Sequence, residues 1–290
     1  MERTRLDKIA FGLGLSGILA LLAALYAKVA PPLFRDWWND PDYTHGLLVI
    51  PLALWFVWER RADLQRAPSR PSPLGALLLA GGLSMLLVGT AGAEFFLQRS
   101  SFVVVVAGLV WLLLGGARLR VLAFPTAFLL FMVPLPAIVM NAVAFPLQLF
   151  AARTATVCLQ GIGIPVLREG NVILLAGTSL EVAEACSGIR SLQALMALAA
   201  VYGYWGGDRT WKRWLLLVAA VPIAVVVNAA RVTGTGLLVQ YWGEEAAEGF
   251  YHSFEGWVLF LAALALLMGV GTLLDRIGPK NHKSLAQETP

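Results

Sequence analysis

Residues 211 to 238 read WKRWLLLVAAVPIAVVVNAARVTGTGLL. Two basic residues at the start are followed by an apolar run from Trp214 to Leu238, which is long enough to cross the hydrocarbon core of a bilayer as a helix. The run contains one arginine, Arg231. A charge inside an apolar span is expensive, so it marks either a paired structural charge or a functional site. The segment therefore predicts a membrane helix with a candidate site near one end.

The composition of the whole chain agrees with this prediction. Its 290 residues are 58% hydrophobic and 14% charged, with a mean hydropathy of +0.72. Soluble domains carry about 25% charged residues. The pI of about 9.3 could suggest nucleic acid, but the basic residues form short clusters between apolar runs, which is the pattern that orients membrane proteins. We expect an all-α integral membrane protein, with residues 1–290 forming one polytopic domain.

Apolar runs of spanning character recur along the chain and predict about eight transmembrane helices. The second run is short and needs its flanks to cross, and the fifth contains two prolines, Pro134 and Pro136, where a helix is expected to end or kink. The first run is longer than a signal-peptide core and is kept as a span. The runs are Ile9–Ala30, Gly46–Trp58, Pro73–Gly92, Phe102–Gly116, Val121–Met140, Ala185–Tyr204, Trp214–Leu238 and Ser253–Leu274.

The connections between these runs alternate in charge. One set is basic: Arg3, Arg5, Lys8; Arg60, Arg61, Arg66, Arg70; Arg118, Arg120; Arg209, Lys212, Arg213; Arg276, Lys280, Lys283. The other set is mainly acidic: Asp36, Asp40, Asp42, Glu94, Glu169, Glu244, Glu245, Glu248. Because basic loops stay in the cytoplasm, both termini are expected inside, and the acidic connections outside.

Three reactive side chains then share one depth near the outer face. Cys186 opens the sixth run, Arg231 lies in the outer half of the seventh, and His252 opens the eighth. A thiolate can attack a carbonyl, an imidazole can carry the proton, and a guanidinium can stabilise the developing negative charge. This combination indicates acyl transfer.

The segment before the cysteine, NVILLAGTSLEVAEAC, predicts a short extracytoplasmic hairpin around Gly177 that leads into a helix. Cys186 would lie in the first turn of that helix, where the helix dipole favours a thiolate. Arg190, four residues later, lies on the same helix face and adds positive potential. Glu184 is a candidate to orient a histidine.

Supporting residues are also candidates. Glu255 follows His252 by three residues and could fix the imidazole, and Asn228 precedes Arg231 by three residues and could hold the guanidinium or cap a neighbouring helix. His45, in PDYTHG, also falls at the outer interface, where a loop or capping role is favoured.

Each of the main residues has a structural alternative. Cys186 could be inert core, or it could form a disulfide with Cys158 in an oxidising compartment. Arg190 and Arg231 could be structural charges paired with Glu184 or with a backbone carbonyl. His252 could be an ordinary interfacial polar residue.

Three blocks in order, EACSGIRSLQAL, NAARVTGTG and YHSFEGWVLF, resemble the exosortase/archaeosortase family, and DYTHGLLVIP resembles an N-terminal block of that family less specifically. The resemblance implies an integral membrane cysteine protease or transpeptidase. It implies that Cys186 is the nucleophile, that Arg231 stabilises the oxyanion or substrate carbonyl, and that His252 is the acid/base partner.

The resemblance also implies the partners. The substrates would be exported proteins with a C-terminal Pro-Glu-Pro-type motif, one transmembrane helix and a basic end, cleaved at the periplasmic face of the inner membrane through a thioacyl intermediate. The resolving group, whether water, an amine, or a hydroxyl of a glycolipid or polysaccharide acceptor, stays open. Membrane lipid surrounds the protein, and no nucleic acid, cofactor or metal is expected.

Two other classes of function stay open as alternatives. A lipid-phosphate enzyme also uses arginine and histidine near an interface, but it needs several basic residues converging on phosphate. A transporter would suit the intramembrane charge and the broken segment at Pro134–Pro136, although its polar residues would gather at the midplane.

Overall fold

The computed structural model describes residues 2–176, 178–182, 189–206, 210–243 and 250–277, with side chains described from residue 12 onward except for 189–191 and 250–257. The chain divides into two compact units, Met1–Pro136 and Ala137–Pro290. Each unit is treated by itself below.

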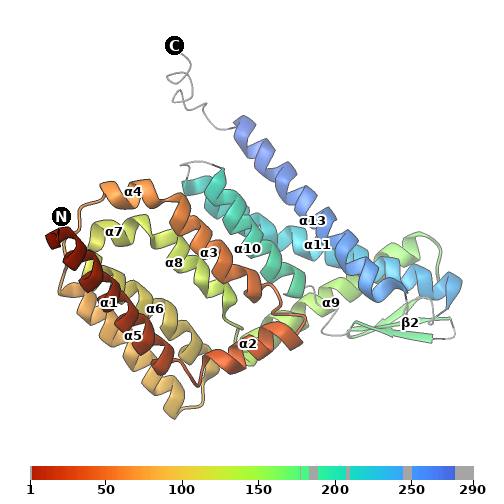
Figure 1. The fold of residues 1–290 in the computed structure, drawn as a ribbon. Coiled ribbons are helices and arrows are strands. Elements are labelled where there is room, and N and C mark those ends of the chain that lie inside the picture. Colours follow the sequence, from red (N-terminus) through yellow and green to blue (C-terminus); the bar gives the residue numbers. More distant parts are fainter. Residues whose placement is uncertain (1, 177, 183–188, 207–209, 244–249, 278–290) are drawn as a thin grey trace. The chain divides into compact units, whose positions relative to one another are not determined.

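The regular secondary structure of the first unit, within its described residues, is entirely helical (Figure 1). The most extensive helix–helix contact in this unit is between α5 and α6, which form a helical hairpin with closely packed backbones. A Cβ atom at Gly75, Gly82 or Gly108 would overlap the facing helix, so these glycines allow the close approach. The elements are α1 (Glu2–Leu25), α2 (Ala30–Asn39), α3 (Gly46–Glu59), α4 (Arg61–Arg66), α5 (Leu74–Ala91), α6 (Phe95–Leu114), α7 (Gly116–Val121), α8 (Ala123–Phe128) and the 3₁₀ helix η1 (Leu129–Met132).

The bend between α1 and α2 gives the unit an amphipathic helix. The two axes differ by 72°. Leu33 and Trp37 of α2 are buried, whereas Phe34 and Trp38 are exposed and stack with their ring centroids 6.1 Å apart. An exposed aromatic pair on a helix that turns away from a spanning segment is typical of the membrane–water interface.

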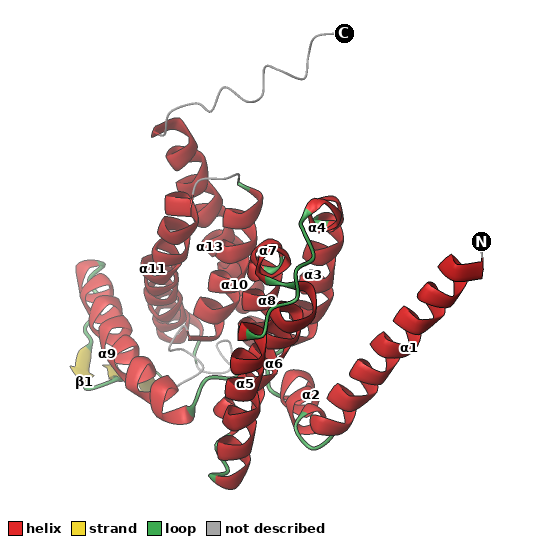
Figure 2. Ribbon diagram, turned by 90° about the vertical axis from the view of Figure 1, so that its left-hand side faces the viewer, coloured by secondary structure: helices red, strands yellow, loops and turns green. Residues whose placement is uncertain are grey.

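In its described residues, the second unit combines four long helices with a small antiparallel sheet of order β1-β2-β3. Figure 2 shows α10, α11 and α13 side by side and α9 next to the sheet. The elements are α9 (Ala137–Gly161), β1 (Leu167–Glu169), β2 (Val172–Leu175), β3 (Thr178–Glu181), α10 (Ile189–Trp205), α11 (Thr210–Trp242) and α13 (Phe250–Ile277).

The described helices confirm an all-α membrane protein and leave the number of crossings a prediction. Five of them are long and apolar enough to span a bilayer, or six if the bent α1–α2 pair counts as one span. Helix α3, the α8–η1 pair and α10 are apolar but shorter. The five are Leu74–Ala91, Phe95–Leu114, Ala137–Gly161, Thr210–Trp242 and Val258–Ile277.

The fifth apolar run behaves as its prolines predict. The α8–η1 segment ends at Met132, and a new helix, α9, begins at Ala137, directly after Pro136. The apolar pattern did not predict helix α9, which is 25 residues long and ends at Gly161. Its mean hydropathy in the best window, 1.4, is the lowest among the five long helices, because polar residues interrupt it.

Candidate functional site

The three helices that carry the predicted reactive residues share one apolar core. Leu195 of α10, Leu216 and Ala220 of α11, and Ala263 and Leu267 of α13 are all 0–1% exposed and belong to the same cluster. Three helices that share a core are held in fixed register along their length. The backbone positions of residues at the helix ends are therefore coupled to one another.

An ion pair between a buried lysine and an exposed aspartate fixes one end of this three-helix group. The ammonium of Lys212 on α11 is 2.7 Å from the carboxylate of Asp275 on α13, and it lies 5.6 Å from the ring centroid of Tyr202 on α10. Lys212 is 2% exposed. A Cβ atom at Gly271 would overlap the same tyrosine ring, so α10 and α13 approach closely here. Lys212, Tyr202 and Asp275 thus lie at one level.

Arg231 lies at the opposite end of the group. The 19 residues from Lys212 to Arg231 rise about 28 Å along α11. The same rise counted back from Asp275 along α13 ends near Gly256, about one helical turn from His252. On α10, 19 residues counted back from Tyr202 end at residue 183 of the sequence, which precedes the first described residue of that helix, Ile189. Gly256, in the second turn of α13, is therefore level with Arg231. The first residue of α13 lies about 9 Å beyond that level, and Ile189, 13 residues from Tyr202, lies about 9 Å short of it.

Arg231 also stands between two cores. The preceding residues Ala224 and Val227 pack with α10 and α13, whereas Val232 and Val239 pack with α9 and the sheet. Asn228, one turn before Arg231, is 5% exposed. Arg231 itself is half-buried, and its carbonyl accepts a hydrogen bond of 3.1 Å from the hydroxyl of Thr235. A half-buried guanidinium at such a junction is positioned by packing on both sides.

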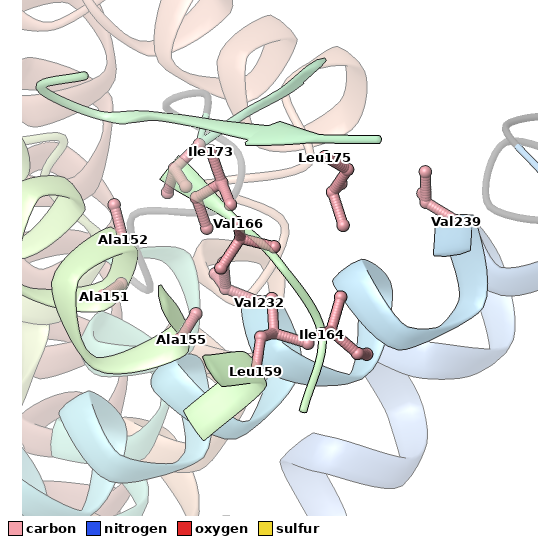
Figure 3. Packing of buried hydrophobic residues seen from close by; sticks show 11 residues of the cluster. Ala151, Ala152, Ala155, Leu159, Ile164, Val166, Ile173, Leu175, Val232 and Val239 are labelled. Carbon is pink, nitrogen blue, oxygen red and sulfur yellow. The ribbon is translucent and has the colours of Figure 1, made fainter. Parts of the chain in front are cut away.

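The sheet rests on α9 and α11. Figure 3 shows Ile173 and Leu175 of β2 directed toward Leu159 of α9 and Val232 of α11. Ile173 and Leu159 are both 0% exposed. A Cβ atom at Gly236 of α11 would lie 2.9 Å from the Leu159 side chain, so this glycine allows α9 to pack closely.

Asn171 holds the chain where it leaves the sheet toward Cys186. Its carbonyl accepts a hydrogen bond of 2.9 Å from the Val182 N–H, and its side-chain amide donates one of 3.3 Å to the Val182 carbonyl. Val182 is 1% exposed. Asn171 was missed in the sequence analysis, although Gly170 before it has a φ of 63° and the pair forms the two-residue turn typical of a hairpin.

The predicted hairpin is confirmed, with an added strand. β2 and β3 pair antiparallel from Val172 opposite Glu181 to Leu175 opposite Thr178, with Gly177 in the connection. The third strand, β1, is short and fully exposed. Its sequence therefore lacks the apolar alternation from which a strand could have been predicted.

The described residues include only part of the predicted site. Cys186 and Glu184 lie outside them, and so do the side chains of Arg190, His252 and Glu255, whose backbones belong to α10 and α13. The roles of these five residues stay predictions. Arg231 and Asn228 are described, both on α11.

His45 belongs to the first unit and has a structural partner there. Its Nε2 atom donates a hydrogen bond of 3.1 Å to the Phe131 carbonyl, and the indole N–H of Trp37 donates one of 2.8 Å to the Met132 carbonyl. Both carbonyls lie at the end of η1, where helical partners run out. Burial lowers the pKa of His45, while its hydrogen bonds to backbone carbonyls oppose that shift. These contacts favour the capping role for His45.

Gln193 is a further polar residue that the sequence analysis missed. It lies on α10 three residues after Arg190, hence on the same helix face. Its amide nitrogen is 3.7 Å from the sulfur of Met140, and its buried Oε1 accepts no hydrogen bond from any described residue. Gln193 follows Cys186 by seven residues, and this spacing was the signal in the sequence that could have identified it as a candidate.

The second cysteine is a free thiol. Cys158 is exposed on α9. The Cys158–Cys186 disulfide that the sequence left open is thus not formed at Cys158.

Comparison with known proteins gives one match. The family model for the transmembrane exosortase (Exosortase_EpsH) matches residues 37–269, a range that begins at Trp37 in α2 and ends within α13. No match was found among curated proteins or among solved structures. Because the match covers most of the chain, including the cysteine, arginine and histidine blocks, the protein belongs to the transmembrane exosortase family.

Proposed function

We propose that this protein is a membrane-embedded cysteine protease or transpeptidase that cleaves the C-terminal sorting tails of exported proteins. The observation that supports the proposal is the shared core of α10, α11 and α13, which holds the starts of α10 and α13 within about 9 Å, along the helix axes, of the level of Arg231. Cys186 precedes the first described residue of α10 by three positions, and His252 is the third residue of α13.

In the proposed reaction the Cys186 thiol passes its proton to His252, and the thiolate attacks the scissile carbonyl of the tail. A C–S bond forms, and Arg231 stabilises the oxyanion. When this intermediate collapses, the C–N bond breaks and His252 gives its proton to the leaving amine. The exported protein then stays on Cys186 as a thioester until water, an amine or a hydroxyl resolves it and restores the thiol.

The packing explains why α11 should carry the arginine. A guanidinium that must hold a transient negative charge works best when it is fixed before the reaction. Arg231 stands where the apolar core shared with α10 and α13 gives way to the core shared with α9 and the sheet. Asn228, buried one turn away, is proposed as its supporting residue, with Glu255 supporting His252, and Glu184 and Arg190 flanking the thiol.

Orientation follows from charge. The basic connections place the Lys212 end of the three-helix group in the cytoplasm, and so the Arg231 end at the periplasmic side of the inner membrane. A sorting tail whose helix spans the same membrane with its basic end inside would present its cleavage motif at that level.

The test is processing of a co-expressed model protein that carries such a tail, normalised to enzyme level in membranes. Cys186→Ala should abolish processing, and His252→Ala should lower it by about 10²- to 10⁴-fold. Arg231→Lys should also be severe, because lysine lacks the planar fork of guanidinium. Cys158→Ala is the matched control and should behave as wild type. Full processing by Cys186→Ala would rule out covalent catalysis.

A further inference from the structure

We propose that strand β3 is the substrate-binding edge of the enzyme, and that an extended segment of the sorting tail adds to it as a fourth strand. This inference rests on the proposed function. It concerns how the tail is held rather than how it is cleaved.

The backbone geometry of β3 defines which groups face outward. The Val182 N–H donates to the Asn171 carbonyl, so these two residues form a hydrogen-bonded pair of the antiparallel ladder. Such pairs alternate with pairs that face away. Leu180 therefore turns its backbone groups toward β2, whereas Ser179 and Glu181 turn theirs to the open side.

The open side has no partner within the described part of the chain. The sheet order is β1-β2-β3, so β3 pairs with β2 alone, and the structure contains no hydrogen bond from a described residue to the outward N–H or C=O of Ser179 or Glu181. Both side chains are exposed. Two donors and two acceptors are thus available in the spacing that an extended peptide matches.

The edge is rigidly supported. Leu180 packs onto the buried cluster that joins the sheet to α9 and α11, and Asn171 fixes Val182 at the end of the strand. A peptide that pairs with β3 would therefore bind a preformed template, which lowers the ordering cost of binding.

The position of β3 in the chain selects the occupant. Glu181 ends the strand, and Cys186 follows five residues later, a distance of at most about 18 Å for extended chain. A peptide paired with β3 can therefore continue toward the proposed nucleophile. A second copy of this chain is a poorer occupant, because an edge of four residues is far smaller than the roughly 1,200 Å² or more that stable interfaces bury.

The opposite edge provides a matched control. In β1, Arg168 lies opposite Ile173, whose backbone groups face β3, so the Arg168 N–H also points away from the sheet. Proline at a position whose N–H points out of an edge strand is tolerated. Ser179→Pro and Arg168→Pro should thus both preserve the sheet, but only Ser179→Pro removes a donor from the proposed binding edge.

The experiment measures cleavage kinetics of full-length enzyme in detergent with a synthetic peptide that carries the tail motif and its flanks. Ser179→Pro is expected to raise KM by about 2- to 12-fold, the range for one lost hydrogen bond, with kcat retained. Arg168→Pro should keep the wild-type KM. A peptide N-methylated at the one residue that pairs with Ser179, located by scanning single N-methyl groups, should show the same KM increase with wild-type enzyme.

Three outcomes would overturn the inference. In the first, the KM stays at the wild-type value for Ser179→Pro and for every N-methylated peptide. In the second, Ser179→Pro and Arg168→Pro raise the KM equally. In the third, Ser179→Pro changes only a dimer–monomer equilibrium, measured by light scattering. If Ser179→Pro fails to fold, the N-methyl scan decides alone. Absence of cleavage by wild-type enzyme would instead refute the proposed function itself.

Discussion

The contact between Ile173 and the helices is expected to hold the sheet in place. Ile173 is 0% exposed in the cluster with Leu159 and Val232, so Ile173→Ala leaves a cavity under β2. Truncations of this kind cost about 2–5 kcal/mol. Since about 1.4 kcal/mol is a factor of ten, local opening of the sheet should become at least about 30-fold more frequent.

Amide hydrogen exchange of residues 172–182 measures this opening directly. The protected N–H groups are those that face a neighbouring strand, such as Val182, which donates to Asn171. They should exchange at least about 30-fold faster in Ile173→Ala. Ile173→Val, with one methyl group removed, should give about a 2- to 12-fold increase, because it costs about 0.5–1.5 kcal/mol.

Leu174→Ala is the matched control. Leu174 is the next residue of β2, and its side chain is only half-buried, on the other face of the sheet. Its truncation should accelerate exchange by less than Ile173→Val does. Equal acceleration by Leu174→Ala and Ile173→Ala, or unchanged exchange in Ile173→Ala, would show that the buried cluster does not hold the sheet.

Two further predictions concern the first unit. The pKa of His45 is lowered in the folded state, so the unfolded chain binds more protons and stability should fall as pH drops below about 6.5. His45→Gln, which keeps a donor for the Phe131 carbonyl, should show a weaker pH dependence of the thermal midpoint, and an unchanged dependence would contradict the assignment. Asp36→Asn breaks a 2.6 Å ion pair to Arg99, which is 8% exposed. It should cost about 1–3 kcal/mol in chemical unfolding, more than Asp63→Asn at an exposed pair; equal costs would contradict it.

The sequence was sufficient for features that depend on long-range hydropathy. The apolar runs became helices, and the break at Pro134–Pro136 appears where the prolines require it. The hairpin between β2 and β3 follows from the apolar-rich runs on either side of Gly177.

Other features depend on partners that no pattern in the sequence reveals. Helix α9 was missed because polar residues such as Gln148, buried at 6% exposure, interrupt its apolar surface. Lys212 was assigned with the basic residues that orient the chain, yet it is buried against Asp275. Asn171 is a turn residue in sequence, and its bonds to Val182 appear only once the strands pair.

The position of Arg231 illustrates the same limit within the site. A lone arginine in an apolar run indicated a site or a paired charge. The packing adds that it lies at the junction of two cores, with the starts of α10 and α13 within about 9 Å of its level. That arrangement depends on how three helices pack, which the sequence of one helix does not contain.

The central claim is that Cys186 carries the exported protein as a thioester. Purified full-length enzyme should be mixed with the tailed model substrate, quenched in acid and mapped by mass spectrometry. We predict that the substrate fragment is attached at Cys186, is released by hydroxylamine, persists in Cys158→Ala and is absent in Cys186→Ala. Cleaved product with no such adduct at any quench time, or an adduct retained in Cys186→Ala, would contradict the account.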